Sequence, residues 1–255
     1  MKVIISGING KMGRVVLDTL SEQSDITVVA GFDRAIAADG DPVYRGEKVR
    51  VYGDMAAYDG KADVIIDFSH FSAVSDLMRY ATASNTPVVV ATTALGEAER
   101  AALRDASKSV AVFHSANMSL GINLAAKMSR LAMPSLEADF NVEIIEKHHT
   151  AKADSPSGTA LLLADAINEA CAAKKNYLYG RHSNHDECKM TDLGIHAVRG
   201  GSLPGQHTVL FAGPDETIEI THTVYSRKVF ALGALKAARF IVGQEAGMYS
   251  MDDLI

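Results

Sequence analysis

Two adjacent histidines, His148 and His149, lie near the middle of the chain, and Lys152 follows three residues after the second. Residues 157–159, Ser-Gly-Thr, come directly after a proline and begin a helical pattern. A histidine can donate a proton near neutral pH. A lysine adds positive charge, and the amides at the start of a helix attract anions. This spacing predicts a site that holds a small anionic substrate and protonates it.

The two histidines can serve one site only under a geometric condition. Side chains at successive positions of a strand point to opposite faces of the sheet. We therefore expect the strand predicted over residues 140–145 to end near the pair, since only then can His148 and His149 both reach a substrate.

A glycine-rich turn near the start of the chain predicts a dinucleotide site. Gly7, Gly10 and Gly13 follow a short apolar run and precede a helical pattern. Glycines there allow a tight turn and a close approach of backbone to pyrophosphate, and the helix start favours negative charge. The spacing is one residue longer than the usual G-x-G-x-x-G, and an ordinary strand-to-helix turn is the alternative.

Asp33 and Arg34 bear on the choice of cofactor. Asp33 lies twenty residues beyond Gly13, at the end of the second predicted strand, where an acid meets the adenosine ribose. An arginine beside it can pair with the 2′-phosphate of NADPH. The pair therefore predicts tolerance of NADH or NADPH, and a solvated surface charge is the alternative for Arg34.

The first 115 residues alternate between short apolar runs and helical patterns. Strands are predicted over residues 3–6, 27–32, 64–68, 87–91 and 110–113, and helices over residues 12–20, 72–83 and 96–106. Uniformly apolar short strands between helices are typical of a parallel sheet covered on both faces, and right-handed crossovers make it doubly wound. Residues 44–60 are predicted to form a loop with one short extra strand.

The pattern changes after residue 117. Helices are predicted over residues 119–132, 157–172 and 231–242, and strands over residues 140–145, 195–199, 208–211 and 217–221. Ile218 and Ile220 alternate with polar neighbours, as in a sheet with one solvated face. The expected fold class is α/β, with an N-terminal Rossmann-type doubly wound parallel sheet and a second α+β domain on a mixed, largely antiparallel sheet. Residues 1–117 form the predicted dinucleotide-binding domain, to which residues 229–255 return, and residues 118–228 form the second domain.

Composition limits the classes of partner. The chain has 255 residues and a formal net charge of −6, which argues against a nucleic-acid partner. It contains no apolar run of roughly 18 residues that would indicate a membrane partner, and no signal-peptide pattern. Cys171 and Cys188 are expected to be reduced thiols, so a cytoplasmic location is predicted. His182, His185 and Cys188 have spacing that a metal site could use, but they lie in a polar run that we interpret as a solvated loop, and no metal site is predicted.

Sequence blocks along the whole chain resemble one enzyme family. They are residues 7–13, 91–93, 115–121, 143–160, 199–201, 207–208 and 219–222. The most specific is Glu-x-His-His-x-x-Lys-x-Asp-x-Pro-Ser-Gly-Thr-Ala over residues 146–160. On these residues the chain resembles the 4-hydroxy-tetrahydrodipicolinate reductase family, formerly called dihydrodipicolinate reductase.

The resemblance implies a reaction and an assembly. The reaction is reduction of (2S,4S)-4-hydroxy-2,3,4,5-tetrahydrodipicolinate, a small dicarboxylate, to tetrahydrodipicolinate by NADH or NADPH, with loss of water. It belongs to lysine and diaminopimelate biosynthesis. The resemblance also implies a two-domain subunit that assembles as a homotetramer through the sheet of its second domain, which binds the substrate.

The resemblance further implies roles for single residues. It makes His148 the acid/base residue and Lys152 the proton donor. The substrate contacts that it implies are His149, Ser157, Gly158 and Thr159. The implied cofactor shell consists of Gly7, Ile8, Asn9, Gly10, Lys11, Met12, Asp33, Arg34, Ala91, Thr92, Thr93, Ser115, Ala116, Asn117 and Met118. Ala91 stands where the family commonly has glycine, and alanine narrows the allowed backbone angles of that loop.

Two other functions stay open from the residues alone. One is another NAD(P)-dependent dehydrogenase of amino-acid metabolism, such as a semialdehyde dehydrogenase, which would usually need a cysteine nucleophile near the site. The other is a non-catalytic nucleotide-sensing protein of the same fold. Loss of His148 or Lys152 would favour the sensor, and both residues are present.

Overall fold

The computed structural model describes residues 1–34, 41–182 and 188–255. The chain divides into two compact units. The first unit consists of Met1–Leu120 and Arg227–Ile255, and the second unit consists of Gly121–Ser226. No helix within the described ranges is long and apolar enough to cross a membrane.

The first unit is built on a seven-stranded sheet whose strand pairings are all parallel. In spatial order the strands are β14 (Gly247–Tyr249), β8 (Ala111–His114), β7 (Val88–Val90), β6 (Val64–Asp67), β1 (Lys2–Ser6), β2 (Thr27–Phe32) and β5 (Val51–Tyr52). The order reverses at β1, which pairs with β2 on one side and with β6 on the other. This confirms the predicted Rossmann-type sheet, and ligands of such sheets bind where the order reverses.

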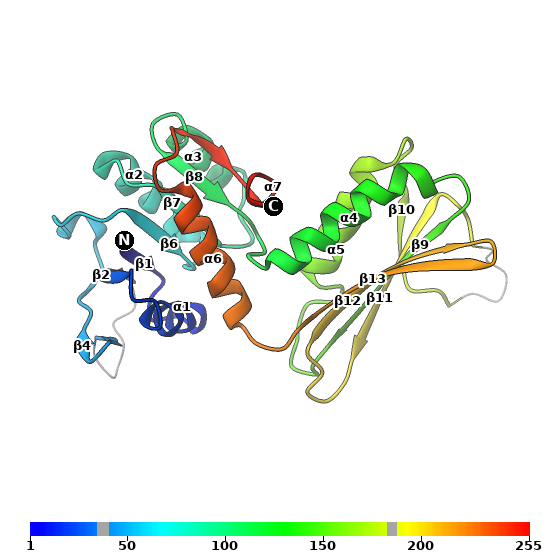
Figure 1. Cartoon of the computed structure of the whole chain (residues 1–255), viewed down its shortest axis with the longest axis horizontal. Helices are drawn as coiled ribbons and strands as arrows, with labels where there is room; N and C mark the ends of the chain where they lie inside the picture. The colour runs from blue at the N-terminus through cyan, green and yellow to red at the C-terminus, as the bar shows by residue number, and fades with distance from the viewer. Residues whose placement is uncertain (35–40, 183–187) are drawn as a thin grey trace. The chain divides into compact units, whose positions relative to one another are not determined.

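Helices cover both faces of this sheet (Figure 1). They are α1 (Lys11–Ser21), α2 (Val74–Ser84), α3 (Glu97–Ala106), α6 (Lys228–Ile241) and the short α7 (Met251–Leu254). Alternate residues of one strand enter opposite cores: Ile5 lies in the core with α1 and α6, and Ile4 in the core with α2 and α3. Both faces bury apolar side chains, which explains why the strands read as continuous apolar runs.

The sequence analysis did not predict several short elements. Residues 44–60 were expected to hold one extra strand, but β3 (Val43–Tyr44) and β4 (Glu47–Lys48) form a small antiparallel pair, and β5 joins the main sheet. A single turn (Met55–Ala57) follows, and another (Phe71–Ala73) precedes α2. β14 was also not predicted. Strands of two or three residues are too short to show a periodic pattern.

The second unit has a five-stranded mixed sheet. In spatial order the strands are β10 (Asn176–Tyr179), β11 (Asp192–Arg199), β9 (Asn141–His148), β12 (Gly205–Gly213) and β13 (Glu216–Val224). β12 pairs antiparallel with β9 and β13, but β11 pairs parallel with β9 and β10. The predicted mixed sheet is confirmed: β12 supplies its antiparallel pairings, and the parallel pairings are those of β11 with β9 and with β10, a strand that was not predicted.

Two helices, α4 (Leu120–Leu136) and α5 (Gly158–Ala170), cover one face of the second sheet. α4 continues through Pro134 beyond the predicted end at residue 132. Val142 and Ile144 on β9 are fully buried in the core with these helices. Because side chains of a strand alternate, Glu146 and His148 follow on the same face. The pattern that builds the core therefore also places a carboxylate and an imidazole at the end of β9.

Candidate active site

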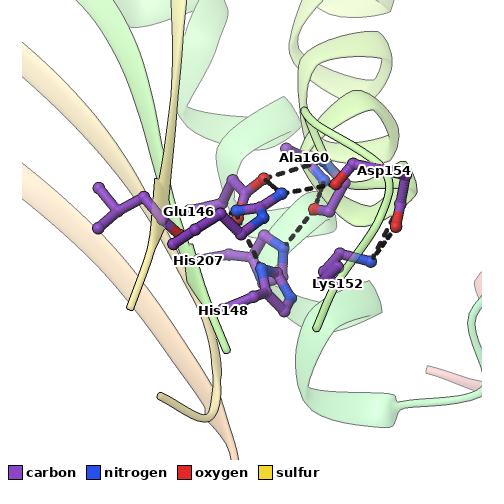
Figure 2. A network of polar contacts seen from close by, with 9 residues as sticks. Glu146, His148, Lys152, Asp154, Ala160 and His207 are labelled. Atoms are coloured by element: carbon purple, nitrogen blue, oxygen red, sulfur yellow. Dashed lines mark hydrogen bonds and ion pairs between the residues drawn. The ribbon is translucent and has the colours of Figure 1, made fainter. Parts of the chain in front are cut away.

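A buried carboxylate, that of Glu146, is the centre of the polar network at the end of β9 (Figure 2). Its side chain is 0% exposed. The Arg199 guanidinium donates to both of its oxygens, at 2.7 Å to Oε2 and 2.8 Å to Oε1. The Ser157 amide donates to Oε1 at 3.0 Å, and His148 Nδ1 lies 2.6 Å from Oε2. Four nitrogen atoms from three residues thus meet one carboxylate.

These contacts determine the protonation of the network. Burial favours the neutral form of Glu146, but the hydrogen bonds from Arg199, His148 and Ser157 outweigh it, so the pKa of Glu146 is lowered. An ionised carboxylate can only accept, so the His148 nitrogen that faces it carries the hydrogen. Nε2 of His148 is then the nitrogen that faces other groups. A Cβ at Gly205 would lie 3.3 Å from this Nε2, so the glycine leaves room beside it.

A second histidine, His207, completes the network. Its Nε2 lies 2.8 Å from Ser157 Oγ, and its ring packs edge-on against His148 with 5.1 Å between ring centroids. Burial, and then the positive charge of His148, lower the pKa of His207 to about 3. His207 is therefore neutral at physiological pH and acts as a packing and hydrogen-bonding group.

We expect acid to destabilise the fold through His207. Its pKa in the folded chain, about 3, is below the ordinary histidine value of 6.5, so the unfolded chain binds the extra proton as the pH falls below 6.5. Its contribution to stability is present above pH 6.5 and lost toward pH 3. Between pH 7.5 and pH 5 this loss amounts to about 2 kcal/mol. Urea unfolding of wild type and His207→Gln at both pH values measures the difference, and equal pH dependence of the two proteins would contradict the expectation.

The strand ends where the histidine pair requires it. β9 stops at His148, one position before the exposed His149, so the alternation of strand side chains no longer separates the two. Lys152 lies in the following turn and donates to both oxygens of Asp154, at 2.8 and 3.0 Å. The hydrogen bond from Lys152 lowers the pKa of Asp154. Asp154 therefore holds the ammonium of Lys152 beside the network, a contact that the sequence reasoning did not anticipate.

The Ser-Gly-Thr turn begins α5 as predicted, with Ser157 as the residue that caps the helix. Ser157 Oγ accepts a hydrogen bond from Ala160 N at 3.1 Å, while the Ser157 amide donates to Glu146. Ser157 is only 1% exposed, so its polar groups serve the network from inside. Gly158 is exposed, and a Cβ built there would meet nothing within 4 Å. A backbone hydrogen bond from Gly158 contributes to the lowered pKa of Asp154, so this helix start lies against that carboxylate.

The first unit holds a cavity of about 970 Å³ at the carboxyl ends of β1 and β2. Cofactor sites commonly have volumes of about 300–1,000 Å³. Of the predicted cofactor residues, those that line the cavity are Gly7, Asn9, Gly10, Asp33 and Arg34. Residues that line it and were not predicted include Tyr52, Phe68, Ser69, His70, Asp76 and Tyr80.

The glycine turn fits a dinucleotide. A Cβ at Gly13 would lie 2.0 Å from the Gly7 carbonyl oxygen, so the turn packs directly on the first turn of α1. Gly10 caps α1 without any side chain that could bond its first amides. The Asn9 amide donates to Asp33 Oδ2 at 3.0 Å, which joins the turn to the end of β2. A helix start with amides left to an anion, beside an acid for the ribose, is the arrangement that a dinucleotide needs.

The remaining predicted cofactor residues do not line this cavity. Lys11 and Met12 begin α1, while Ile8 is fully buried and packs against Gly31. Thr93 is exposed, and Ala116 and Met118 follow β8, with Met118 buried. Ser115 Oγ and Asn117 bond each other within the turn after β8. Ala91 is not among the described residues with positive φ, so the alanine in place of glycine imposes no strain there.

A buried aspartate that sequence reasoning missed joins these turns. Asp67, at the end of β6, is fully buried and lies 2.6 Å from the Thr92 hydroxyl. The Ser69 amide donates to its Oδ1 at 3.1 Å. Burial raises the pKa of Asp67 against these hydrogen bonds. Because the carboxyl ends of neighbouring parallel strands share one edge, Asp67 holds the turns after β6 and β7 together there.

Among residues 1–34, 41–182 and 188–255, no group of three His, Cys, Asp or Glu side chains is arranged to hold a metal ion. His185 of the polar run falls in residues 183–187, outside the described part of the chain. The two cysteines, Cys171 and Cys188, form no disulfide.

The chain is similar to proteins of one family over nearly its whole length. Two family models match the chain, "Dihydrodipicolinate reductase, N-terminus" over residues 1–118 and "Dihydrodipicolinate reductase, C-terminus" over residues 121–255. A 4-hydroxy-tetrahydrodipicolinate reductase of Caldanaerobacter subterraneus is 46% identical over 255 residues, which covers 100% of this chain and 98% of the relative. That of Clostridium tetani is 42% identical and covers 100% and 97%.

Solved structures share the fold. A dipicolinate-bound dihydrodipicolinate reductase from Paenisporosarcina sp. TG-14 has a TM-score of 0.83 at 24% identity, covering 100% of this chain and 99% of that one. A probable dehydrogenase from Thermotoga maritima has a TM-score of 0.66 at 12% identity, covering 100% and 92%. At these identities the likeness shows a common fold of sheet and helices.

Proposed function

The chain belongs to the dihydrodipicolinate reductase family, and from this premise we propose which of its residues carry the family's reaction. The reaction is NAD(P)H-dependent reduction of (2S,4S)-4-hydroxy-2,3,4,5-tetrahydrodipicolinate to tetrahydrodipicolinate with loss of water, in lysine and diaminopimelate biosynthesis. One observation carries the assignment of residues: His148 points one nitrogen at a buried carboxylate and keeps the other for a ligand, beside Lys152 and the start of α5.

The first unit holds the cofactor in this proposal. The residues of the glycine turn receive the pyrophosphate, and Asp33 accepts from the ribose. When bound, NADH or NADPH supplies the hydride that reduces the substrate. Thr92, Ser115 and Asn117 act from the neighbouring turns; Asp67 holds Thr92, and Ser115 and Asn117 hold each other. Ile8 and Met118 are buried, so they contribute backbone groups rather than side chains.

The second unit supplies protons and binds the substrate. Reduction and loss of water add a hydride and a proton to the substrate and release one water. We assign the proton to His148, whose Nε2 faces away from Glu146, and the neighbouring positive charge and second proton source to Lys152. His149, Gly158 and Thr159 contact the carboxylates of the substrate, for which the start of α5 is suited. Ser157 is buried and positions this turn through its hydrogen bond to Glu146, rather than by contacting the substrate.

One assay tests the function. The protein is coupled to a dihydrodipicolinate synthase, pyruvate and aspartate semialdehyde are supplied, and the absorbance of NADH and then of NADPH is followed. We expect oxidation of the cofactor that depends on both substrates of the synthase. No oxidation of either cofactor by folded protein would refute the proposal.

The two cofactors should differ because of the partners of Arg34. Its guanidinium donates to Asp76 Oδ2 at 2.7 Å and to the Ser72 carbonyl oxygen at 3.2 Å, and Arg79 contacts the same aspartate. A 2′-phosphate must therefore compete with Asp76 for Arg34, so NADH is the expected better cofactor.

Asp76→Asn should release Arg34 and strengthen NADPH binding. The gain is expected to be at most about fivefold, since exposed ion pairs contribute roughly 0–1 kcal/mol. Fluorescence titration gives Kd for both cofactors without turnover. Asp105→Asn removes a similar exposed pair, with Lys108, that does not line the cavity, and it should change neither Kd. An unchanged NADPH-to-NADH ratio in Asp76→Asn would contradict the expectation.

We also propose that the protein is a cytoplasmic homotetramer that assembles through the sheet of the second unit. β13 is a nine-residue edge strand with largely exposed side chains, among them Ile218 at 41%. Long exposed edge strands are commonly covered by another chain. Light scattering coupled to gel filtration should give about four times the chain mass of 27.2 kDa. A monomeric mass at micromolar concentration would refute the tetramer.

A further inference from the structure

Glu146 has no part in the reaction as assigned so far, yet it lies where the acting groups meet. Its carboxylate joins His148 on β9, Arg199 on β11 and the Ser157 amide at the start of α5. Arg199 also donates to the Asp154 carbonyl oxygen at 2.6 Å, and the Asp154 side chain holds Lys152. The segment that carries Lys152 is thereby tied to the same carboxylate (Figure 2).

The geometry is that of a carboxylate that orients a working imidazole. A hydrogen bond between an ionised carboxylate and an N–H of imidazole fixes the ring and its tautomer, and the negative charge favours the protonated ring. At 2.6 Å the contact between His148 Nδ1 and Glu146 Oε2 has the length of a strong charge-assisted bond. The side chains of both residues are shielded from water, with His148 12% and Glu146 0% exposed.

We propose that Glu146 is a positioning residue: it holds His148 with Nε2 toward the substrate, while Arg199 keeps Glu146 in place. This inference rests on the proposed role of His148 as the proton donor. Arg199 is suited to its part because its planar guanidinium binds both carboxylate oxygens at once. A buried charge without such a partner would be strongly unfavourable.

Other charged groups face His148 from every neighbouring element. Arg199 lies on β11, His207 on β12, and Lys152 and Asp154 in the turn after β9. His207 is neutral, and Lys152 and Asp154 form a pair of opposite charges. Glu146 is therefore the anion in direct contact with the ring, and its removal should change the orientation of His148 more than removal of any other neighbour.

Glu146→Gln tests the inference because it keeps the shape of the side chain and removes its charge. We expect kcat to fall roughly 100-fold or more, as when the orienting partner of a catalytic imidazole is lost. KM for NADH should stay within about twofold. The loss should therefore fall on kcat rather than on cofactor binding, because His148 without its carboxylate partner is no longer held in one orientation. Glu146→Asp keeps the charge and should recover part of kcat.

The chain offers a matched control on the same strand. Glu143 of β9 contacts His196 Nε2 at 2.6 Å and the Arg181 guanidinium, so it forms a similar carboxylate–histidine–arginine group. It lies on the other face of the sheet from Glu146, because three positions separate the two. Glu143→Gln should leave kcat and its pH profile unchanged. A purely structural role of a β9 glutamate would affect both variants alike.

If the Glu146→Gln protein does not fold, the double variant Glu146→Gln/Arg199→Gln is measured in its place, because it removes both charges. Nitrogen-15 NMR of the histidines in wild-type protein gives a second measurement, in which His148 should carry its hydrogen on Nδ1 at high pH. The inference is overturned if either folded variant keeps the wild-type kcat, or if Nδ1 of His148 is the bare nitrogen. If the wild type itself oxidises neither cofactor, the proposed function fails instead.

Discussion

His148→Gln protein should lose roughly 10²–10⁴-fold in kcat, the contribution that a positioned general acid makes. Glutamine can retain a hydrogen bond to Glu146, but it cannot give up a proton near neutral pH. NADH affinity should stay within about twofold, because the residues assigned to the cofactor lie in the first unit. The coupled assay measures kcat, and fluorescence titration measures Kd for NADH.

His196, a histidine outside the site, provides the control for this variant. It contacts Glu143 rather than Glu146, and it is partly exposed. His196→Gln should keep wild-type turnover. If folded His148→Gln turns over at the wild-type rate, His148 is not the acid, and the assignment of the site in the second unit is wrong.

Lys152→Met should lower kcat/KM for the ring substrate roughly 10²–10³-fold, the range found when one group that stabilises developing charge is removed. The ammonium is 22% exposed and bound to Asp154, so it is held in place before substrate arrives. Its removal also leaves Asp154 as an uncompensated negative charge beside a site for a dicarboxylate. Both effects weaken binding of the substrate, and both reduce the stabilisation of the charge that forms during reduction.

Lys147→Met is the control for this variant. Lys147 is a neighbouring cation on β9, but it lies on the face opposite to Glu146 and His148. Its loss should leave kcat/KM within about twofold, measured with saturating NADH and varied synthase-derived substrate. Equal losses in the two variants would mean that general positive charge, rather than the placed ammonium, accounts for the effect.

Local pattern determined the parts of this protein that lie close together in sequence. The apolar runs of β1, β6 and β7 can be buried only between two helical layers, so their composition alone indicates the doubly wound sheet. The glycine turn comes directly after β1, and Asp33 and Arg34 come directly after β2, which pairs with β1 in parallel. Their positions in the sequence therefore indicated that they lie near each other. His148, Lys152 and the start of α5 fall within one segment of fewer than fifteen residues, and a strand end followed by a helix start brings them near each other.

Tertiary structure alone decided which groups surround those residues. Arg199 reaches Glu146 across 53 positions of sequence, and His207 reaches Ser157 across 50. Thr92 meets Asp67 across 25 positions. These contacts depend on β11 pairing parallel with β9 and on β12 pairing antiparallel on its other side. Strand pairing is set by burial of whole faces across the sheet, which the periodicity of a single strand does not reveal. The sequence therefore indicated the residues that we propose as proton donors, and only the packed sheet decided which groups hold them.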